Sequence, residues 1–265
     1  MSSESIVFDP AVDYYDETRG FAPGVEGPAI ALMARAGGFA SGDRVLEVGI
    51  GTGRIALPLA AHVRAVVGVD LSRAMMGRLL DKRTGRAVYP VLGDATHLPL
   101  LANAFDGAVA VHVFHLIPAW QTALREVARA LKPGARLVSA FYDQPDKLSP
   151  VHETLSQAWD EAVGRDRMEN VGVSRAQYGT FLADEGWRQD GEPHIYEYTQ
   201  TRTPREHIRR MEERIWSQCW RLPDAVIVRG VTAMREAAAR EGIDLDAPFE
   251  VPSSFKALAY FPPEG

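Results

Sequence analysis

The chain of 265 residues contains a single cysteine, Cys219, which excludes an internal disulfide and is typical of proteins kept in a reducing compartment. It has no apolar run close to the roughly 20 residues that a membrane-spanning helix needs. The start of the sequence lacks the basic and apolar parts of a secretory signal. Lysine and arginine number 29 against 35 aspartate and glutamate residues, which disfavours a surface for nucleic-acid phosphates. We therefore expect a cytoplasmic protein that binds neither a membrane nor nucleic acid.

The first half of the chain has the alternating pattern of an α/β protein. Short β-branched runs are separated by turns and helical stretches, as in a parallel sheet with crossover helices. Each run is apolar enough to be covered on both faces of the sheet. The predicted strands are residues 44–48, 65–69, 87–92, 107–113 and 136–141. A Lys-Pro-Gly stretch at 132–134 is expected to end a helix before the fifth strand.

The second half is mostly helical in pattern. Residues 143–150 are polar and contain two prolines, which marks an exposed connection after the fifth strand. The predicted helices beyond it are 151–163, 175–185, 204–220 and 223–241, and the predicted strands are 194–201 and 254–261. We therefore expect two more sheet strands, seven in all, with a helical pair inserted between the last two.

A glycine-rich turn follows the first predicted strand. Gly49, Gly51 and Gly53 alternate with Ile50 and Thr52, and a helical pattern begins at once after them. Such a turn lets a ligand approach the backbone closely and meet the free N–H groups of the helix. The glycine fingerprint of dinucleotide-binding proteins needs a small residue at the position directly after Gly53. That position is arginine, residue 54, which disfavours a nicotinamide cofactor without excluding it.

Glu47 precedes these glycines, and Glu-Val-Gly-Ile-Gly-Thr-Gly at 47–53 resembles the loop of class I S-adenosylmethionine-dependent methyltransferases. The resemblance covers about residues 13–142. It implies a Rossmann-like α/β fold with a seven-stranded, mostly parallel sheet, flanking helices and a helical cap inserted near the C-terminus. It also implies that the glycine backbone lies against the amino-acid part of S-adenosylmethionine, while Glu47 supports the loop or the cofactor's ammonium group through water. The alternative is a generic tight turn with a surface carboxylate.

The end of the second strand carries the next motif, Gly-Val-Asp-Leu-Ser at 68–72. The resemblance implies that Asp70 accepts hydrogen bonds from both ribose hydroxyls, which an ionised carboxylate can do, and that Leu71 also contacts the cofactor. Asp70 could instead cap the following helix, although Ser72 is better placed for that role. Met75 either contacts the ribose or adenine or only packs within the helix.

Two further motifs follow the third and fourth strands. In Leu-Gly-Asp-Ala at 92–95, the resemblance implies that Asp94 accepts from the adenine amino group and that the backbone near Ala95 reads the ring edge; Asp94 could also merely cap a turn. His112 is expected beside the cofactor, and His115 nearer the acceptor, where it is the candidate general base. Both could equally be structural residues. They form no recognisable metal site, because a third ligand is missing.

The segment before the first core helix, Tyr-Tyr-Asp-Glu-Thr-Arg at 14–19, resembles the segment that closes over the cofactor in relatives. Tyr15 and Arg19 would then bind the carboxylate of S-adenosylmethionine, unless the segment is only surface. The predicted organisation is an N-terminal lid and first helix, a cofactor-binding core, and a cap with the last two strands that packs with the core as one compact unit. The boundaries are 1–40, 41–142 and 143–265.

The acceptor is not readable from the motifs. The pattern resembles the ubiquinone and menaquinone biosynthesis type of methyltransferase, which many acceptors share, and motifs of nucleic-acid methylation such as Asn-Pro-Pro-Tyr are missing. A small-molecule acceptor is therefore predicted. A non-catalytic protein that binds S-adenosylmethionine or S-adenosylhomocysteine remains an alternative, as does a nicotinamide-dependent reductase.

The predicted cap contains tryptophans and a charged helix. The tryptophans at 159, 187, 216 and 220 could line an apolar pocket, but most are predicted to be core residues. Arginines and glutamates interleave on the helix from residue 204, which is typical of a solvated face.

Overall fold

The computed structural model describes residue 5 and residues 7–144, 149–166 and 173–263. The chain forms two compact units. The first, which we call the sheet unit, comprises Met1–Tyr142, Asn170–Tyr196 and Phe255–Gly265. The second, the helical unit, comprises Asp143–Glu169 and Glu197–Ser254.

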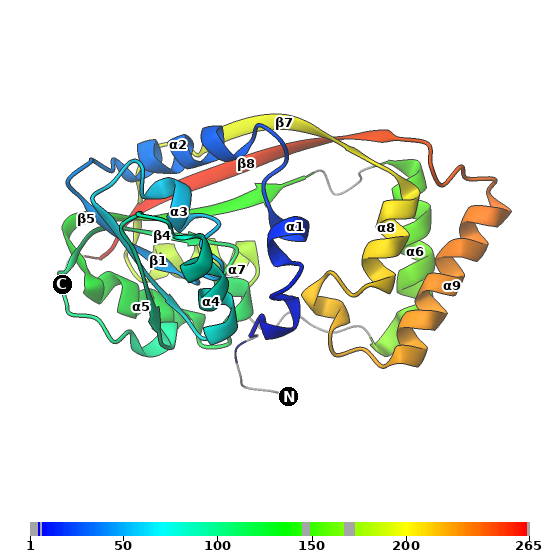
Figure 1. Ribbon diagram of the computed structural model, residues 1–265, viewed down its shortest axis with the longest axis horizontal. Coiled ribbons are helices and arrows are strands. Elements are labelled where there is room, and N and C mark those ends of the chain that lie inside the picture. The colour runs from blue at the N-terminus through cyan, green and yellow to red at the C-terminus, as the bar shows by residue number, and fades with distance from the viewer. Residues whose placement is uncertain (1–4, 6, 145–148, 167–172, 264–265) are drawn as a thin grey trace. The chain divides into compact units, whose positions relative to one another are not determined.

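The sheet has eight strands in the order β3-β2-β1-β4-β5-β8-β6, and β7 pairs with β8 (Figure 1). Their bounds are β1 (Arg44–Val48), β2 (Ala65–Asp70), β3 (Val88–Leu92), β4 (Phe105–Val111), β5 (Leu131–Asp143), β6 (Arg188–Gln189), β7 (His194–Arg202) and β8 (Phe249–Phe261). The strands β1 to β5 pair in parallel, and β6 pairs antiparallel with β8. In the register, Val48 pairs with Val69 and Ala110, and Asp70 pairs with Leu92. The carboxyl ends of β1 to β4 therefore lie along one edge of the sheet.

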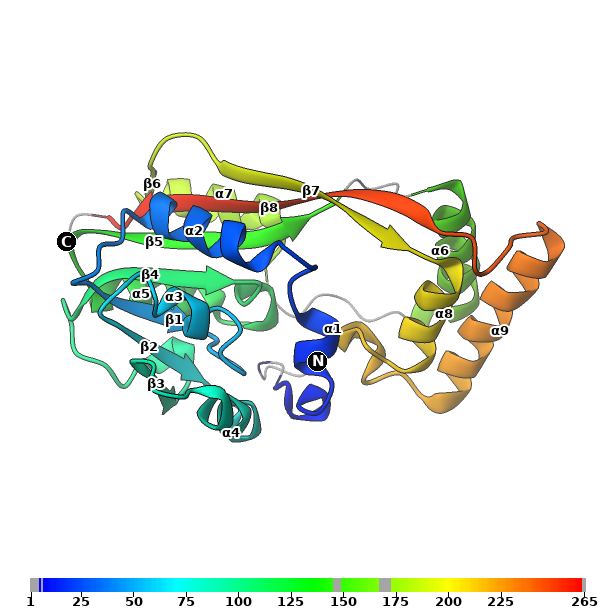
Figure 2. The same cartoon turned by 45° about the horizontal axis from the view of Figure 1, so that its top comes forward.

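Helices flank the parallel strands, as Figure 2 shows. Those of the sheet unit are α1 (Tyr15–Arg19), α2 (Glu26–Gly37), α3 (Ala56–Leu59), α4 (Arg73–Lys82), α5 (Trp120–Ala130) and α7 (Arg175–Asp184). In α5 the buried residues recur three or four positions apart, which gives one apolar face. That face packs in one core cluster with Leu46 and Val48 of β1. Val45 of β1 is also fully buried, so the strand is covered on both faces, as parallel strands are.

The helical unit is built from α6 (Pro150–Val163), α8 (Pro204–Glu212) and α9 (Asp224–Arg240). Its core includes Leu155, Trp159 and Met234. Gly230 lets α9 approach α6 closely, because a Cβ at this position would lie 2.5 Å from the Trp159 ring. The order β7-α8-α9-β8 confirms the predicted insertion of a helical pair between two strands, and the α/β class and mostly parallel sheet are confirmed as well.

Several predicted boundaries differ from the structure. The additional strand β6 has only two residues, too few for a pattern to reveal. The predicted helix at 204–220 ends at Glu212, because Arg214 adopts a left-handed backbone with a φ of 53°. Trp220 then donates from Nε1 to the carbonyl of Arg214, and a short 3-10 turn, η5 (Ser217–Cys219), follows the break. β4 ends at Val111 rather than residue 113, since His112 also has a positive φ.

Residues 143–265 are predicted above as one segment that packs with the core, whereas the structure divides them. Residues 170–196 and 255–265 belong to the sheet unit, and 143–169 and 197–254 form the helical unit. The close packing of cap and core therefore stays a prediction. Among the residues that the structure describes, no helix has the length and apolar character to cross a membrane.

Candidate functional site

The glycine turn connects β1 to α3 and needs three left-handed residues. Gly49, Gly51 and Gly53 have φ values of 74°, 51° and 79°, which glycine adopts at little cost. A Cβ on Gly49 or Gly53 would lie 2.8 Å from a neighbouring side chain, so the protein itself fills the space beside them. A Cβ on Gly51 would meet only Met75 Cε at 3.8 Å and Asp70 Oδ2 at 4.0 Å. The backbone at Gly51 is therefore the part of the turn that a ligand can approach.

Asp70, the last residue of β2, is tied to this turn. Its Oδ2 accepts a hydrogen bond from the Gly51 amide at 2.8 Å, and its Oδ1 accepts from the Ser72 amide at 2.8 Å. Burial raises the pKa of Asp70, while these backbone hydrogen bonds act in the opposite direction. Each carboxylate oxygen retains a second lone pair for a further donor. The N-cap of α4 is Ser72, whose Oγ accepts from the Met75 amide at 3.0 Å, so Asp70 is not the helix cap.

Apolar side chains are exposed next to Asp70. Leu71, the next residue, is 39% exposed, and Leu92, the partner of Asp70 across the β2–β3 pair, is 47% exposed. These two side chains offer an apolar surface that the flat face of a ring can cover. Met75 packs in the core with 2% of its surface exposed, and its Cε would lie 3.8 Å from a Cβ on Gly51. A contact between Met75 and the cofactor stays a prediction.

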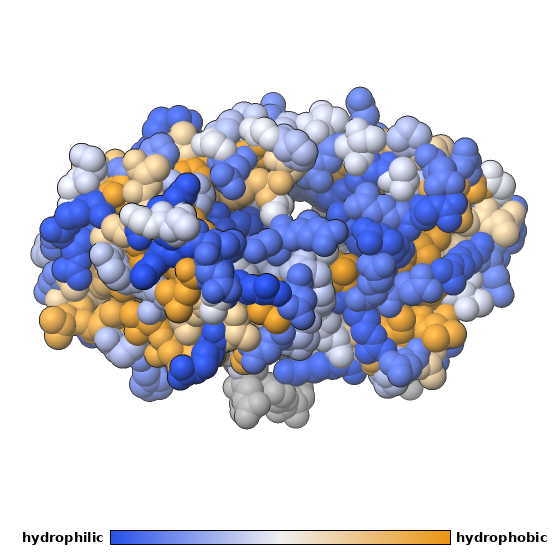
Figure 3. Space-filling view, in the orientation of Figure 1, coloured by the Kyte–Doolittle hydropathy of each residue, from blue (hydrophilic) through white to orange (hydrophobic). Residues whose placement is uncertain are grey.

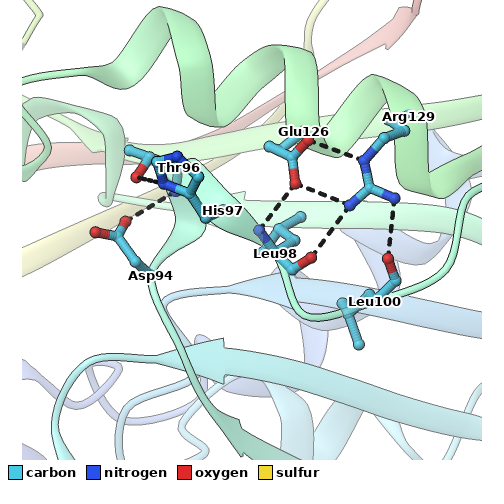
Figure 4. A network of polar contacts seen from close by, with 7 residues as sticks. All are labelled: Asp94, Thr96, His97, Leu98, Leu100, Glu126 and Arg129. Atoms are coloured by element: carbon cyan, nitrogen blue, oxygen red, sulfur yellow. Dashed lines mark hydrogen bonds and ion pairs between the residues drawn. The ribbon is translucent and has the colours of Figure 1, made fainter.

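Asp94 lies in the loop after β3, and Figure 4 shows it beside the first turn of the 3-10 helix η2 (Ala95–His97). Its Oδ1 accepts from the Thr96 amide at 2.8 Å, so it does cap the turn, as the alternative interpretation proposed. That bond leaves acceptor capacity on the carboxylate. Capping and adenine binding are therefore compatible roles for Asp94.

The same loop is fastened to α5 by a network that the motifs do not reveal (Figure 4). Glu126 Oε2 accepts from the Leu98 amide at 2.9 Å, and Arg129 pairs with Glu126 at 2.8 Å. Arg129 also donates to the carbonyls of Leu98 and Leu100 at 3.1 and 2.9 Å. The part of the loop that follows η2, from Leu98 to Leu100, is thereby held in place by α5. Glu126 and Arg129 lie three residues apart, which is the only sequence signal of this clamp.

The two histidines have different environments. His112 accepts a hydrogen bond at Nε2 from the Tyr142 amide at 2.7 Å, and its ring stacks on Tyr142 with centroids 5.3 Å apart. It therefore links the end of β4 to β5. His115 lies in the 3-10 turn η3 (Phe114–Leu116), 6.3 Å from the His112 ring centroid. Burial lowers the pKa of His115, and the charge of Arg19 lowers it further, so the ring is neutral at pH 7.

The N-terminal segment packs on the glycine turn and α4 through three aspartates that sequence reasoning missed. Asp9 accepts from Ser72 Oγ, Asp13 pairs with Arg78 on α4, and Asp16 accepts from Lys82 at 2.6 Å. Asp16 also accepts from Thr52 Oγ1, within the glycine turn. The two predicted residues of this segment have other contacts: the Tyr15 ring meets Phe8 edge to face, and Arg19 acts electrostatically on His115.

Glu47 is buried below the turn, with 2% of its surface exposed. Among the described residues its Oε2 has no hydrogen-bond partner. Burial raises the pKa of Glu47 well above its ordinary value, although the charge of Arg54 opposes this. A hydrogen bond from the Ala56 backbone also favours the ionised form, but a buried carboxylate oxygen without a partner is costly and points to a role outside folding.

Arg54 begins the segment after the glycines but turns away from them. It donates from a terminal guanidinium nitrogen to the Tyr142 hydroxyl at 2.8 Å, and its guanidinium lies over the Phe21 ring, 5.1 Å from the centroid. The described residues contain no group of three side chains that could hold a metal ion.

The comparison with known families agrees with this arrangement of glycine turn, Asp70 and Asp94. Residues 46–139 match the family model described as a methyltransferase domain. These residues form a class I methyltransferase domain. The matched segment thus begins within β1 and ends within β5.

Curated relatives resemble the same part of the chain. Phosphatidylethanolamine N-methyltransferase of Cereibacter sphaeroides is 35% identical over 124 residues, which are 44% of this chain and 61% of that protein. Demethylmenaquinone methyltransferase of Renibacterium salmoninarum is 35% identical over 114 residues, which are 43% of this chain and 47% of that protein. The chain therefore spans about half to three fifths of the length of these relatives.

Solved structures share the fold over most of the chain. YcgJ of Bacillus subtilis has a TM-score of 0.55 at 18% identity and covers 90% of this chain, with all of its own chain matched. Phosphoethanolamine N-methyltransferase 2 of Haemonchus contortus, solved with S-adenosyl-L-methionine, has a TM-score of 0.54 at 22% identity, covering 97% of this chain and 57% of that one. At these identities the likeness confirms the Rossmann-like fold of the methyltransferase domain.

Proposed function

We propose that this protein transfers the methyl group of S-adenosylmethionine to a small-molecule acceptor. The observation that carries the proposal is Asp70, whose two oxygens are oriented by the Gly51 and Ser72 amides beside the open backbone of the glycine turn. A carboxylate fixed in this way suits a pair of ribose hydroxyls. The relatives named above support a small acceptor, because their names describe a lipid and a quinone precursor as substrates.

The other residues fit the same cofactor. Asp94 would accept from the adenine amino group, and Leu71 with Leu92 would contact the ring. The unpartnered oxygen of Glu47 would receive the ammonium group through water, and Tyr15 with Arg19 would bind the carboxylate. The cofactor supplies a methyl group already activated on a positively charged sulfur. The protein therefore needs mainly to align the acceptor and exclude water.

A nicotinamide-dependent reductase is less well supported. The dinucleotide fold needs a small residue where this chain has Arg54, so that the helix packs closely below the pyrophosphate. The long side chain of Arg54 is instead held by Tyr142 and Phe21. This contact supports a cofactor without a pyrophosphate.

Calorimetry tests the cofactor directly. We expect S-adenosylmethionine and S-adenosylhomocysteine to bind the purified chain, and NADH to give no heat above dilution. Binding of NADH alone would contradict the proposal. Where S-adenosylmethionine binds but a screen of metabolite fractions shows no methyl transfer, the protein is a cofactor-binding protein without catalytic activity.

His115 is proposed as the general base for an acceptor that must lose a proton. Its lowered pKa keeps the ring unprotonated at pH 7, so turnover should be constant above neutral pH and fall only below the ordinary histidine value of 6.5. With the acceptor from the screen, His115→Ala should lower turnover by about 10²- to 10⁴-fold. The affinity for S-adenosylhomocysteine should not change. The exposed His62→Ala serves as the control, and unchanged turnover in His115→Ala would discard the role.

A further inference from the structure

The helical unit contains a pocket that the proposed function does not use. Its volume is about 320 Å³, at the small end of the range that ligand pockets occupy. Side chains from α6, β7 and α8 contribute to its lining. Those that matter here are His152, Ser156, Trp159, Arg202, His207 and Trp216. All of them belong to the helical unit, so the pocket is defined within that unit alone.

Arg202 lies at the end of β7 and lines the pocket, and a residue of the same strand holds its side chain. Tyr198, Gln200 and Arg202 alternate along the strand and share its half-buried face. Arg202 donates to Gln200 Oε1 at 3.2 Å. Gln200 in turn donates to the Tyr198 hydroxyl at 3.3 Å and to Ser253 Oγ at 3.4 Å. This support fixes the guanidinium rather than neutralising it, because every partner is uncharged.

No carboxylate in the described part of the chain forms an ion pair with Arg202, although the charge of Glu206 acts on it without a direct bond. Its bond to Gln200 is its one hydrogen bond to a described residue, and its Nε is buried without a partner. Glu206, the acidic residue nearest in sequence, is engaged by Arg210 through bonds of 3.1 and 2.6 Å. Asp160 also lines the pocket, but it is exposed to solvent. A partly buried cation without a directly bonded carboxylate favours an anion in the pocket.

Two histidines lie beside Arg202 without adding charge. The rings of His152 and His207 are 4.2 Å apart, and Ser156 Oγ lies 3.4 Å from His152 Nδ1 and 3.3 Å from His207 Nε2. Burial lowers the pKa of His207 to about 3, and His152, Arg202 and Arg210 act in the same direction. Burial and Arg202 also lower the pKa of His152, with Glu153 opposing. Both rings are therefore neutral at pH 7. Of the other charged residues in the lining, Arg210 is paired with Glu206 and Asp160 is exposed, so Arg202 is the half-buried cation best placed to meet a ligand anion.

Part of the pocket wall is aromatic. Trp159, Trp216 and Phe249 contribute to the lining, and Trp216 is held by the Arg210 guanidinium, 5.6 Å from its ring centroid. Aromatic walls favour a flat or apolar ligand body. The surface around α8 and α9 is mixed, with hydrophilic residues interspersed among apolar ones (Figure 3).

We propose that the helical unit binds a small molecule that carries a carboxylate or phosphate group on a flat, apolar body, with Arg202 holding the anionic group. The proposed function assigns roles only to residues of the sheet unit, and this inference rests on it only where the ligand is the methyl acceptor. The ligand is either the methyl acceptor or a separate small molecule. Both sources share the chemistry of an anion attached to an aromatic or apolar body.

Titrations of the full chain with benzoate and phenyl phosphate test the proposal, with the neutral benzamide as the matched compound. Trp159 and Trp216 line the pocket and report binding through their fluorescence. We expect saturable binding with a dissociation constant of about 1 mM or lower for the anions, as suits such small fragments, and at least about tenfold weaker binding of benzamide. Equal binding of benzamide, or no saturation by either anion up to about 10 mM, overturns the proposal.

Variants then test whether Arg202 binds the anionic group of the ligand. Arg202→Gln should weaken benzoate binding by about tenfold or more, because a charge-assisted hydrogen bond is lost. The control Arg205→Gln, which removes an exposed pair with Asp246, should leave binding unchanged. Unchanged benzoate binding by a folded Arg202→Gln protein overturns the proposal. If this variant fails to fold, the NMR resonance of the Arg202 Nε–H group in the wild-type protein tests the proposal instead. Benzoate must shift this resonance, and benzamide must not.

Methyl-transfer activity of the same variant distinguishes the two possible ligands, the methyl acceptor and a separate small molecule. If the ligand is the methyl acceptor, Arg202→Gln raises the KM for the acceptor while the affinity for S-adenosylhomocysteine stays unchanged. If the ligand is a separate molecule, the variant loses benzoate binding but keeps its methyl transfer. The benzoate titration needs no methyl transfer, so failure of the proposed function leaves this test intact.

Discussion

Replacing Asp70 by asparagine is expected to weaken the binding of S-adenosylmethionine by about a hundredfold, or about 3 kcal/mol. The amide retains one oxygen but turns an NH2 group toward either the Gly51 or the Ser72 amide, which both need an acceptor. The ribose also loses a charged acceptor for its two hydroxyls. Calorimetry with S-adenosylmethionine and S-adenosylhomocysteine measures the effect on both ligands.

The exposed Asp81→Asn on α4 is the control for the loss of one negative charge nearby. It should bind S-adenosylmethionine like the wild type. A thermal melt without ligand shows whether Asp70→Asn is folded at the temperature of the titration. Wild-type affinity in a folded Asp70→Asn protein would remove the central support of the proposed function.

Replacing Glu47 by glutamine is expected to change stability and cofactor binding in opposite directions. The wild-type carboxylate is buried and its Oε2 has no partner among the described residues, so its ionised form opposes folding. We expect Glu47→Gln to raise the free energy of unfolding of the ligand-free protein by about 1 to 3 kcal/mol at pH 8. The same variant should bind S-adenosylmethionine about tenfold more weakly, because the ammonium group loses a negative partner.

The pH dependence of this effect has a definite sign. The pKa of Glu47 in the folded protein lies above its ordinary value of 4.5, so the folded state holds the proton more tightly than the unfolded state. The wild type must therefore lose stability as the pH rises from 4.5 through the folded pKa. Glutamine has no such titration, and the gap between variant and wild type should widen with rising pH.

Urea unfolding at several pH values between about 5 and 8 measures this gap through the linkage of proton binding to stability. The exposed Glu192→Gln in the sheet unit is the matched control and should follow the wild type at every pH. Destabilisation of the ligand-free protein by Glu47→Gln at pH 8 would mean that the buried carboxylate contributes to folding. Its role at the cofactor would then lose support.

The elements around the glycine turn were predictable because their signals are local. The strand at 44–48 agrees with the structure at both ends, since an apolar run between polar turns suffices to mark a buried parallel strand. Asp70 is identified by its place at a strand end, and parallel strands bring such ends to one edge. Ser72 was correctly preferred as the helix cap because capping depends on residues only three positions apart.

The charged helix of the helical unit shows where local patterns fail. Arg205 and Arg209 are exposed, as the solvated-face prediction requires, but Arg210 is half-buried and lines the pocket with its partner Glu206. Trp159 and Trp187 are core residues as predicted, with 4% and 6% of their surface exposed. The helix ends eight residues early because Arg214 adopts a left-handed backbone that no propensity assigns to arginine.

By itself, the sequence determined the α/β class, most strands of the sheet, and the acidic residues within β1, at the end of β2 and after β3. Those features depend on periodicity and on short motifs, which one segment of chain contains completely. Only the tertiary structure decided that Asp9, Asp13 and Asp16 hold the N-terminal segment on the glycine turn and α4. It alone also placed Arg202 beside two neutral histidines from other elements. Such contacts join residues tens of positions apart, and their energies depend on burial that no local pattern records.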